Sequence, residues 1–436
     1  MKKTLFVLFL VFALVGLVYA VDIQFWHAMG GERIEYFENV AKEFEALHPD
    51  INVEVQFNGS YRDNLNKTIA AVNSGTPPNV VQVFEIGTQM MIDGGIIVPV
   101  QDLMDNDPTF DPGIFLTPIT NYYTVDGKLY SIPFNSSTAI MYYNKTMFEE
   151  AGLDPDSPPR TFEDFIEVCK ALTVKDANGN IEQTGFTWPL HSWFIEQLLA
   201  AQNAPLVNNG NGRDGRPTEC VINNAAGLTI FEWLNTLAEG GYLINTKFED
   251  WSAARNLFMS QKAGILFDST SNVASHKANA AENGYELGTC FLPKPADAPS
   301  GGAVIGGASL WIIDGNPMDE MEASWEFVKF LNSKEQQMNW HKFTGYFPVT
   351  KEAVEGLLFS GFYQEEPDHM TAMMQLLLSV PSKNTAGAIC GVFPEMRTII
   401  ETKIQEMCNG EITPVKAIDE AAEECTAAIE EYNSIF

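Results

Sequence analysis

The sequence predicts an α/β protein of two lobes, each a mostly parallel sheet flanked by helices, with a ligand cleft between the lobes. Three observations predict this class. Strand and helix patterns alternate over residues 21–84, which is typical of a largely parallel sheet. The chain has 436 residues, enough for two such units. Pro- and Gly-rich segments interrupt the later strand patterns, as expected where a chain crosses between lobes.

The first half of the chain supports this interpretation element by element. "VDIQFWHAM" (21–29) and "NVVQVF" (79–84) predict buried strands, and "INVEVQF" (51–57) alternates apolar and polar residues as a half-buried strand does. Between them, "RDNLNKTIAAVNSG" predicts a helix that ends at Gly75. An earlier amphipathic helix has one apolar face formed by Ile34, Phe37, Val40, Ala41, Phe44 and Leu47.

Later patterns continue in the same style. Thr161 and Asp164 form a capping box at the start of a helix. The remaining predicted elements are a strand in "TAIMYY" (138–143), a helix over 225–238, a strand in "AGILFDSTS", a strand in "GGASLWII" and helices beyond Pro317. We therefore expect a first lobe of residues 21–134 plus about 303–345, and a second of about 135–302 plus 346–436.

The first twenty residues have the pattern of a signal peptide. Lys2 and Lys3 precede an apolar run over 5–18, and Val18-Tyr19-Ala20 ends it with an acceptable cleavage site. We expect cleavage near Ala20 and export of the mature chain to the periplasm.

The net charge narrows the range of partners. Without Lys2 and Lys3 the chain has 24 basic and 57 acidic residues, a formal charge of −33. Such a chain repels nucleic acid, so we expect no nucleic-acid partner. A small anionic ligand then needs a local cluster of donors to hold it.

Motifs for catalysis and metal binding are missing from the sequence. The six cysteines include no C-x-x-C, the six histidines no H-E-x-x-H, and the chain has neither G-x-S-x-G nor a P-loop. We expect no enzyme activity, metal or cofactor, although composition cannot reveal a glycosidase carboxylate pair. Export permits disulfides, and Cys408 and Cys425 are the closest cysteines in sequence.

Polar residues recur where predicted strands begin or end. Glu85 follows one strand, "NSS" (135–137) precedes another, and Ser269 and Ser271 end a third. Gly306 and Gly307, Tyr346 and Arg397 add backbone N–H groups, a hydroxyl and a cation. Together these groups suit an oxyanion or phosphate, while Glu85 and Tyr61 suit ligand hydroxyls. Each residue taken alone is more often a turn, cap or surface residue, and only their recurrence at strand ends points to a binding site.

Several segments make the chain similar to a known family. "YYNKTMFEEAGLDPDSPPRTFEDF" and "FLNSKEQQMNW" resemble segments of the extracellular solute-binding proteins of ABC importers, which include binders of maltose-type sugars. Within that family, the most similar members are those that bind sn-glycerol-3-phosphate. The matching segments, in order, are "FWHAMGGE", "NGSYRDNL", "QVFEIGTQMM", "PFNSSTAIMYYNK", "IGGASLWI", "HKFTGYFPVTKEA" and "PEMRTII".

The resemblance implies a monomeric, two-lobed binding protein that delivers sn-glycerol-3-phosphate to the transmembrane permease and, through it, to the ATPase. It implies that Tyr61 and Glu85 hold the glycerol hydroxyls. The phosphate-side set that it implies is Ser137, Ser269, Gly307, Tyr346 and Arg397, with Ser271 as an alternative to Ser269 and Arg397 as the main anchor. Trp26, Trp188 and Trp193 line the cleft or fill the core. Glycerophosphodiesters are further candidate ligands. Two other functions stay open: an oligosaccharide-binding protein of a sugar importer is the alternative, and a secreted glycoside hydrolase is the third hypothesis.

Overall fold

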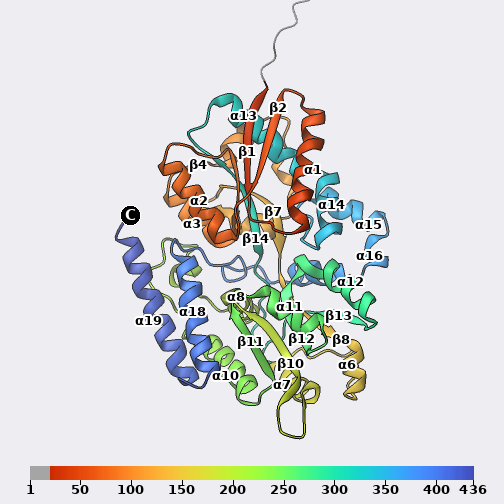
Figure 1. The fold of residues 1–436 in the computed structure, drawn as a ribbon. Helices are drawn as coiled ribbons and strands as arrows, with labels where there is room; N and C mark the ends of the chain where they lie inside the picture. Colours follow the sequence, from red (N-terminus) through yellow and green to blue (C-terminus); the bar gives the residue numbers. More distant parts are fainter. Residues whose placement is uncertain (1–19) are drawn as a thin grey trace, which may run out of the picture.

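The computed structural model describes residues 20–436, so the predicted signal peptide lies outside the described residues except for Ala20. Two six-stranded sheets form separate layers, one in each half of the molecule (Figure 1). The first sheet contains β1 (Val21–His27), β2 (Ile51–Phe57), β3 (Val80–Phe84), β4 (Ile97–Val98), β7 (Ile132–Ser137) and β14 (Gly306–Ile313). The second contains β8 (Ala139–Asn144), β9 (Val174–Lys175), β10 (Ile181–Leu190), β11 (Leu243–Phe248), β12 (Ala263–Ser269) and β13 (Leu287–Cys290).

Both sheets are mixed, which corrects the expectation of mostly parallel sheets. In the first, β1 is parallel to β2 and β3, but β14 is antiparallel to β3, β4 and β7. In the second, β10 is parallel to β11 and β12, but β8 is antiparallel to β12 and β13. The reason is the crossing of the chain. β8 enters the second sheet from the first lobe, so it starts at the edge where β12 ends. β14 enters the first sheet from the second lobe, so it starts at the edge where β3 ends.

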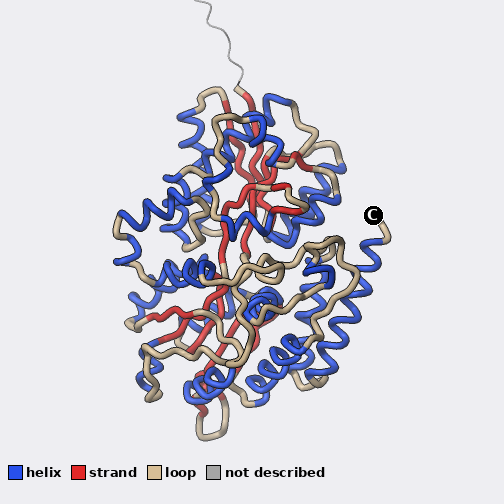
Figure 2. Tube along the Cα trace, turned by 180° about the vertical axis from the view of Figure 1, so that it is seen from behind, coloured by secondary structure: helices blue, strands red, loops and turns tan. Residues whose placement is uncertain are grey.

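The strands at which the chain crosses between the lobes bring the candidate site residues to the boundary between the two sheets. Only Thr138 separates β7 from β8, and residues 291–305 join β13 to β14. Seen from behind, the strands form two groups, with connecting segments running between them (Figure 2). The ends of β3, β7 and β12 and the start of β14 therefore meet at one level between the two sheets.

Helices cover both sheets (Figure 1). Those of the first lobe are α1 (Glu32–Leu47), α2 (Tyr61–Asn73), α3 (Thr88–Asp93), α4 (Val100–Asn106), α5 (Thr117–Tyr123), α13 (Met318–Leu331) and α14 (Lys334–Thr344), with the 3-10 turns η1 (Glu85–Gly87) and η2 (Pro112–Ile114) and the hairpin β5 (Thr124–Val125) and β6 (Lys128–Leu129). The helices of the second lobe are α6 (Lys145–Glu150), α7 (Phe162–Leu172), α8 (Ser192–Ala201), α9 (Asn208–Asn211), α10 (Ala225–Glu239), α11 (Trp251–Met259), α12 (Val273–Asn283), α18 (Phe393–Cys408) and α19 (Pro414–Asn433), with the turn η3 (Thr270–Asn272). The chain between the two sets forms α15 (Lys351–Phe359), α16 (Phe362–Glu365) and α17 (Asp368–Leu377).

The predicted helix signals hold with one difference. Thr161 accepts a hydrogen bond from the Asp164 backbone N–H at 3.1 Å, which caps α7. The buried face of α1 is narrower than predicted, because Leu47 at its last position is 67 % exposed. No helix among residues 20–436 is both long and apolar enough to cross a membrane.

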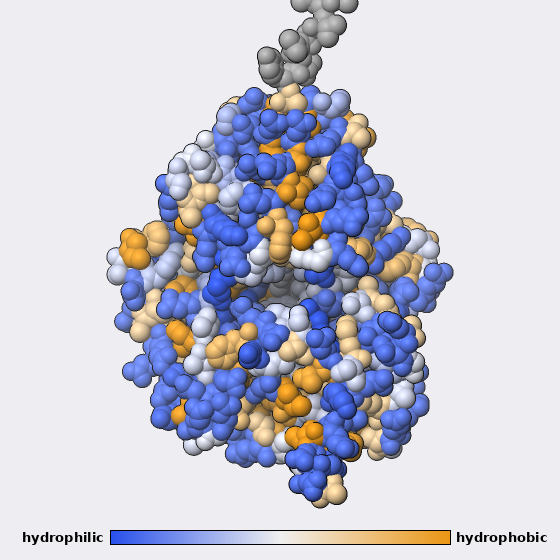
Figure 3. Space-filling view, in the orientation of Figure 1, coloured by the Kyte–Doolittle hydropathy of each residue, from blue (hydrophilic) through white to orange (hydrophobic). Residues whose placement is uncertain are grey.

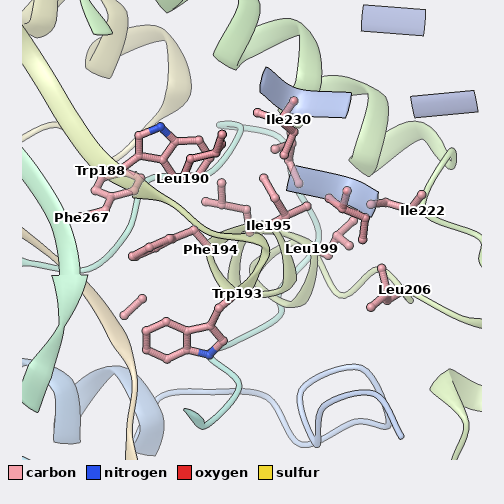
Figure 4. Packing of buried hydrophobic residues seen from close by; sticks show 14 of the residues in the cluster. Trp188, Leu190, Trp193, Phe194, Ile195, Leu199, Leu206, Ile222, Ile230 and Phe267 are labelled. Atoms are coloured by element: carbon pink, nitrogen blue, oxygen red, sulfur yellow. The ribbon is translucent and has the colours of Figure 1, made fainter. Parts of the chain in front are cut away.

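Aromatic side chains build the core of the second lobe (Figure 4). Trp188 is fully buried and packs against Phe186 and Phe194, and its indole N–H donates to Asn245 at 2.6 Å. Trp188 is therefore a core residue and does not line the cleft. Trp26 is half-buried and packs against the same continuous core.

The six cysteines are free in the described structure. The thiol of Cys425 lies against Cys220 rather than Cys408. Helical geometry explains this, because Cys425 lies three turns into α19 whereas Cys408 ends α18. The two residues are therefore too far apart along the helix pair to form a bridge.

Candidate functional site

A cavity of about 310 Å³ opens between the two lobes. The space-filling view shows a hollow at this boundary (Figure 3). The cavity walls contain all seven residues predicted from the sequence, namely Tyr61, Glu85, Ser137, Ser269, Gly307, Tyr346 and Arg397. Ser271 lines it as well, so Ser269 at the end of β12 and Ser271 in the turn after it face the same space. The ligand roles of these residues stay predictions.

The local fold explains how each of the polar groups reaches the cavity. Glu85 directly follows β3, and Ser137 is the last residue of β7. Ser60 caps α2 in a capping box with Asp63, which fixes Tyr61 at the first helical position. Gly307 pairs with Ser136 and has φ +93°, and a Cβ there would lie 1.9 Å from the Asn135 carbonyl oxygen. Only glycine fits this close backbone crossing.

A buried ion-pair cluster forms one end of the cavity. Arg397 makes two parallel bonds to Glu196, at 2.8 and 2.9 Å, and a third to Glu85 at 2.6 Å. The exposed fractions of the Arg397, Glu85 and Glu196 side chains are 4 %, 5 % and 10 %. Burial raises the pKa of Glu85, although the charge of Arg397 opposes the shift. Arg397 thus faces two carboxylates, and its charge is balanced before any ligand arrives.

A network of hydrogen bonds positions the two tyrosines. Gln82 donates to the Asn135 side-chain oxygen, and the Asn135 amide donates to the Tyr61 hydroxyl, both at 2.8 Å. The Tyr61 and Tyr346 hydroxyls lie 3.4 Å apart. Burial raises the pKa of Tyr61 well above its usual value, so this hydroxyl stays protonated and can donate to a ligand. Asn135, the first residue of the "NSS" segment, therefore orients Tyr61.

The other end of the cavity contains cations and hydroxyls. Arg33, in the first turn of α1, donates to the Ser271 carbonyl oxygen at 3.0 Å and lies over the Tyr346 ring, 5.7 Å from its centroid. Arg255, from α11, makes two bonds to the buried Asp268, at 2.7 and 3.0 Å. This end is therefore built from both lobes.

Asp268 is held in its charged form. It also contacts His276 at 2.9 Å and accepts from the Ser269 backbone N–H at 2.7 Å. Burial alone would raise the pKa of Asp268, but the charge of Arg255 and the hydrogen bonds lower it below its usual range. The resulting anion locks the guanidinium of Arg255 in place.

A third wall is aromatic. His191, Trp193 and Trp251 lie side by side, with ring centroids 5.2 Å apart for His191 and Trp251 and 6.3 Å for the two tryptophans. Glu249 stands beside them and accepts from Arg62 at 3.3 Å. Flat rings next to a carboxylate can stack on an apolar ligand face or bind a cationic group.

His191, Glu249 and Glu401 bring three metal-ligating atoms within 4.8 Å of one another. Their hydrogen bonds use these atoms for other purposes. His191 Nδ1 accepts from the Trp193 backbone N–H at 3.0 Å, and Glu401 accepts from that of Ser192 at 2.8 Å. Burial raises the pKa of Glu401 to about 8, so it carries a proton at neutral pH. We therefore assign no metal to this group.

Sequence reasoning missed several residues of the cavity. His191 directly follows β10 and Arg33 lies shortly after β1, so the rule of polar residues at strand ends could have found both. Arg255 and Trp251 lie on a helix and gave no such signal. Only the fold brings Arg255 to the end of β12.

Comparison with known proteins agrees with this architecture. The family model of bacterial extracellular solute-binding proteins matches residues 39–371. The sn-glycerol-3-phosphate-binding periplasmic protein UgpB of Pectobacterium atrosepticum is 32% identical over 419 residues, covering 95% of this chain and 92% of the relative. UgpB of Rhizobium meliloti is 33% identical, covering 94% of each.

Two solved structures share the fold. UgpB of Mycobacterium tuberculosis in complex with glycerophosphocholine has a TM-score of 0.78 at 19% identity, covering 95% of this chain and 99% of that one. The GacH receptor of Streptomyces glaucescens, solved with acarbose, also has a TM-score of 0.78, at 17% identity, covering 94% and 99%. The two-lobed α/β fold predicted from the sequence is therefore confirmed, and the chain belongs to the family of bacterial extracellular solute-binding proteins.

Proposed function

We propose that this chain is the periplasmic substrate-binding subunit of an ABC importer and that it captures sn-glycerol-3-phosphate. The observation that carries the proposal is that seven residues, predicted from scattered segments, line one cavity between two lobes. The relatives at 32–33% identity, which bear the name of sn-glycerol-3-phosphate-binding proteins, support the same ligand.

The cavity suits a small molecule with two chemically different ends. At one end, Glu85 can accept from ligand hydroxyls and Tyr61 can donate to them. At the other, hydroxyls and guanidinium groups match phosphate oxygens. Enclosure between the lobes strengthens these contacts, because charges interact more strongly away from bulk water.

Delivery requires the lobes to open and close. Side chains of the two lobes meet across the cavity: Arg33 bonds Ser271, Glu85 bonds Arg397, and Arg62 donates to the Pro394 carbonyl oxygen at 3.0 Å. The lobes close by a hinge motion. A ligand that adds further bonds across this boundary stabilises the closed form. The closed form is what the transmembrane permease recognises, and the chain acts as a monomer without catalysis.

A second candidate keeps the binding function and changes the ligand to an oligosaccharide. The aromatic wall of His191, Trp193 and Trp251 favours it, since sugar faces stack on flat rings. The guanidinium groups of Arg33 and Arg255 at the other end of the cavity favour the phosphate ligand instead.

Calorimetric titration separates these ligands. We expect sn-glycerol-3-phosphate to bind with one site per chain and to raise the melting temperature, because it binds only the native state. Glycerophosphocholine, which shares the glycerol phosphate unit, is the second titrant and maltose the third. Binding of maltose without sn-glycerol-3-phosphate would replace the proposed ligand by a sugar, and release of sugar from an oligosaccharide would indicate an enzyme.

A further inference from the structure

We propose that Arg33 and Arg255, rather than Arg397, are the charge partners of the ligand phosphate. This inference rests on the proposed function and assigns the two ends of the cavity. The phosphate lies between the lobes at the end formed by Ser269, Ser271 and Tyr346. The glycerol hydroxyls lie toward Glu85.

The first step of the argument is the state of Arg397. Its Nε and Nη2 atoms already donate to Glu196 and Glu85, and all three side chains are at least nine-tenths buried. A dianion placed on this cluster would meet two carboxylates at close range. The cluster suits a neutral hydroxyl, for which Arg397 holds Glu85 in position.

Arg33 has the opposite surroundings. Arg62, Arg255 and Arg397, the other arginines of the cavity, each pair with a carboxylate. Arg33 has no carboxylate within 4.0 Å among residues 20–436, and its one described hydrogen bond goes to a backbone carbonyl oxygen. An arginine has five N–H donors. Arg33 therefore offers a full positive charge and several donors to the cavity.

Arg255 supplies the second partner and a fixed geometry. Its Nε and Nη2 atoms donate to Asp268, which is fully buried, while 26% of the Arg255 side chain stays exposed. The Nη1 atom has no partner among the described residues. Because His276 and the Ser269 N–H hold Asp268, the free edge of Arg255 is oriented before a ligand binds.

The two arginines belong to different lobes. Arg33 lies in the first turn of α1 in the first lobe, and Arg255 lies in α11 of the second. A phosphate bound by both joins the lobes through two charge-assisted contacts. The chain is strongly negative, so Arg33 and Arg255 provide the local positive charge that lets a dianion enter the cavity. Because the bound dianion contacts both lobes, the closed form depends on the dianion.

The experiment is calorimetric titration of wild type, Arg33→Gln and Arg160→Gln with sn-glycerol-3-phosphate at pH 7.5. Arg160 is an exposed arginine outside the cavity, so Arg160→Gln changes the net charge equally. Loss of a charged hydrogen bond predicts about 10- to 100-fold weaker binding for Arg33→Gln. Arg160→Gln should stay within twofold of wild type. Arg255→Lys keeps the ion pair with Asp268, and hence the fold, and should also bind more weakly.

A pH series tests the charge itself. The second phosphate pKa of a monoester is about 6, so the dianion fraction rises about fourfold between pH 5.5 and 7.5. Wild-type affinity should follow this rise, and Arg33→Gln should follow it less. An Arg33→Gln protein with wild-type affinity and the wild-type pH response would overturn the inference. If wild type itself binds maltose and not the phosphate, the proposed function fails instead.

Discussion

Arg397→Ala tests whether this residue primarily balances buried carboxylates. The change leaves Glu85 and Glu196, with side chains 5 % and 10 % exposed, without their shared cation. Removing one partner of a buried pair costs about 3–5 kcal/mol of folding free energy. Two carboxylates face Arg397 here, so the loss should lie at the upper end of that range at pH 8.

The pH dependence gives a second, independent signature. Burial already raises the pKa of Glu85, and without Arg397 the main interaction that opposes the shift is lost. A carboxyl whose folded-state pKa lies above its unfolded value stabilises the fold at low pH and loses that contribution as the pH rises. The deficit of the variant relative to wild type should therefore shrink between pH 8 and about pH 5.

Urea denaturation of wild type and Arg397→Ala at pH 8 and at about pH 5 measures this difference in the free energy of unfolding. With a denaturant slope near 3 kcal/mol/M, the variant's midpoint should fall by about 1 M or more at pH 8. The double variant Arg397→Ala/Glu85→Gln, which has one buried charge fewer, should recover part of the loss. If Arg397→Ala unfolds at the wild-type midpoint and binds about a hundredfold more weakly, the reasoning is refuted and Arg397 is the phosphate anchor first expected from the sequence.

Three further changes test the rest of the site. Glu85→Gln should weaken binding of sn-glycerol-3-phosphate in calorimetry and leave the circular dichroism spectrum unchanged, since Arg397 keeps Glu196; a collapsed spectrum would mean a structural role. Glu401→Gln should raise the urea midpoint at pH 9 and hardly at pH 5, because the unfolded-state carboxyl ionises from about pH 4.5 while the folded one, with a pKa of about 8, keeps its proton, so wild type loses stability over that range; equal gains at both values would contradict this. Gly307→Ala should lower the melting temperature, because the added Cβ meets a backbone oxygen at 1.9 Å, and an unchanged value would show that the strands can separate there.

The strands and most helices could be predicted because their signals are local. The alternation in "INVEVQF" and the cap at Thr161 depend on neighbours a few residues away. The direction in which a strand runs within its sheet is not given by local signals. That β14 runs antiparallel to β3 follows from a crossing that no local pattern describes.

The same distinction applies to the cavity. Glu85 and Ser137 are detectable because they directly adjoin strands, and all seven predicted residues do line one space. Their charges are set by partners far away in sequence: Arg397 meets Glu196, 201 positions earlier, and Arg33 meets Ser271, 238 positions later. The sequence alone does not show which of Arg33 and Arg397 has its charge free for a ligand. Their contacts in the folded chain distinguish them.

The pairing of β7 with β14 has a consequence for how a ligand is captured. These strands lie side by side where the chain passes between lobes, with Gly306 opposite Ser137. If the lobes turn about this crossing, Ser137 and Gly307 move little, whereas Arg33 in α1 and Arg255 in α11 move apart with their lobes. Substitutions of Ser137 or Gly307 should then alter the first encounter with the ligand, and substitutions of Arg33 or Arg255 the lifetime of the closed complex.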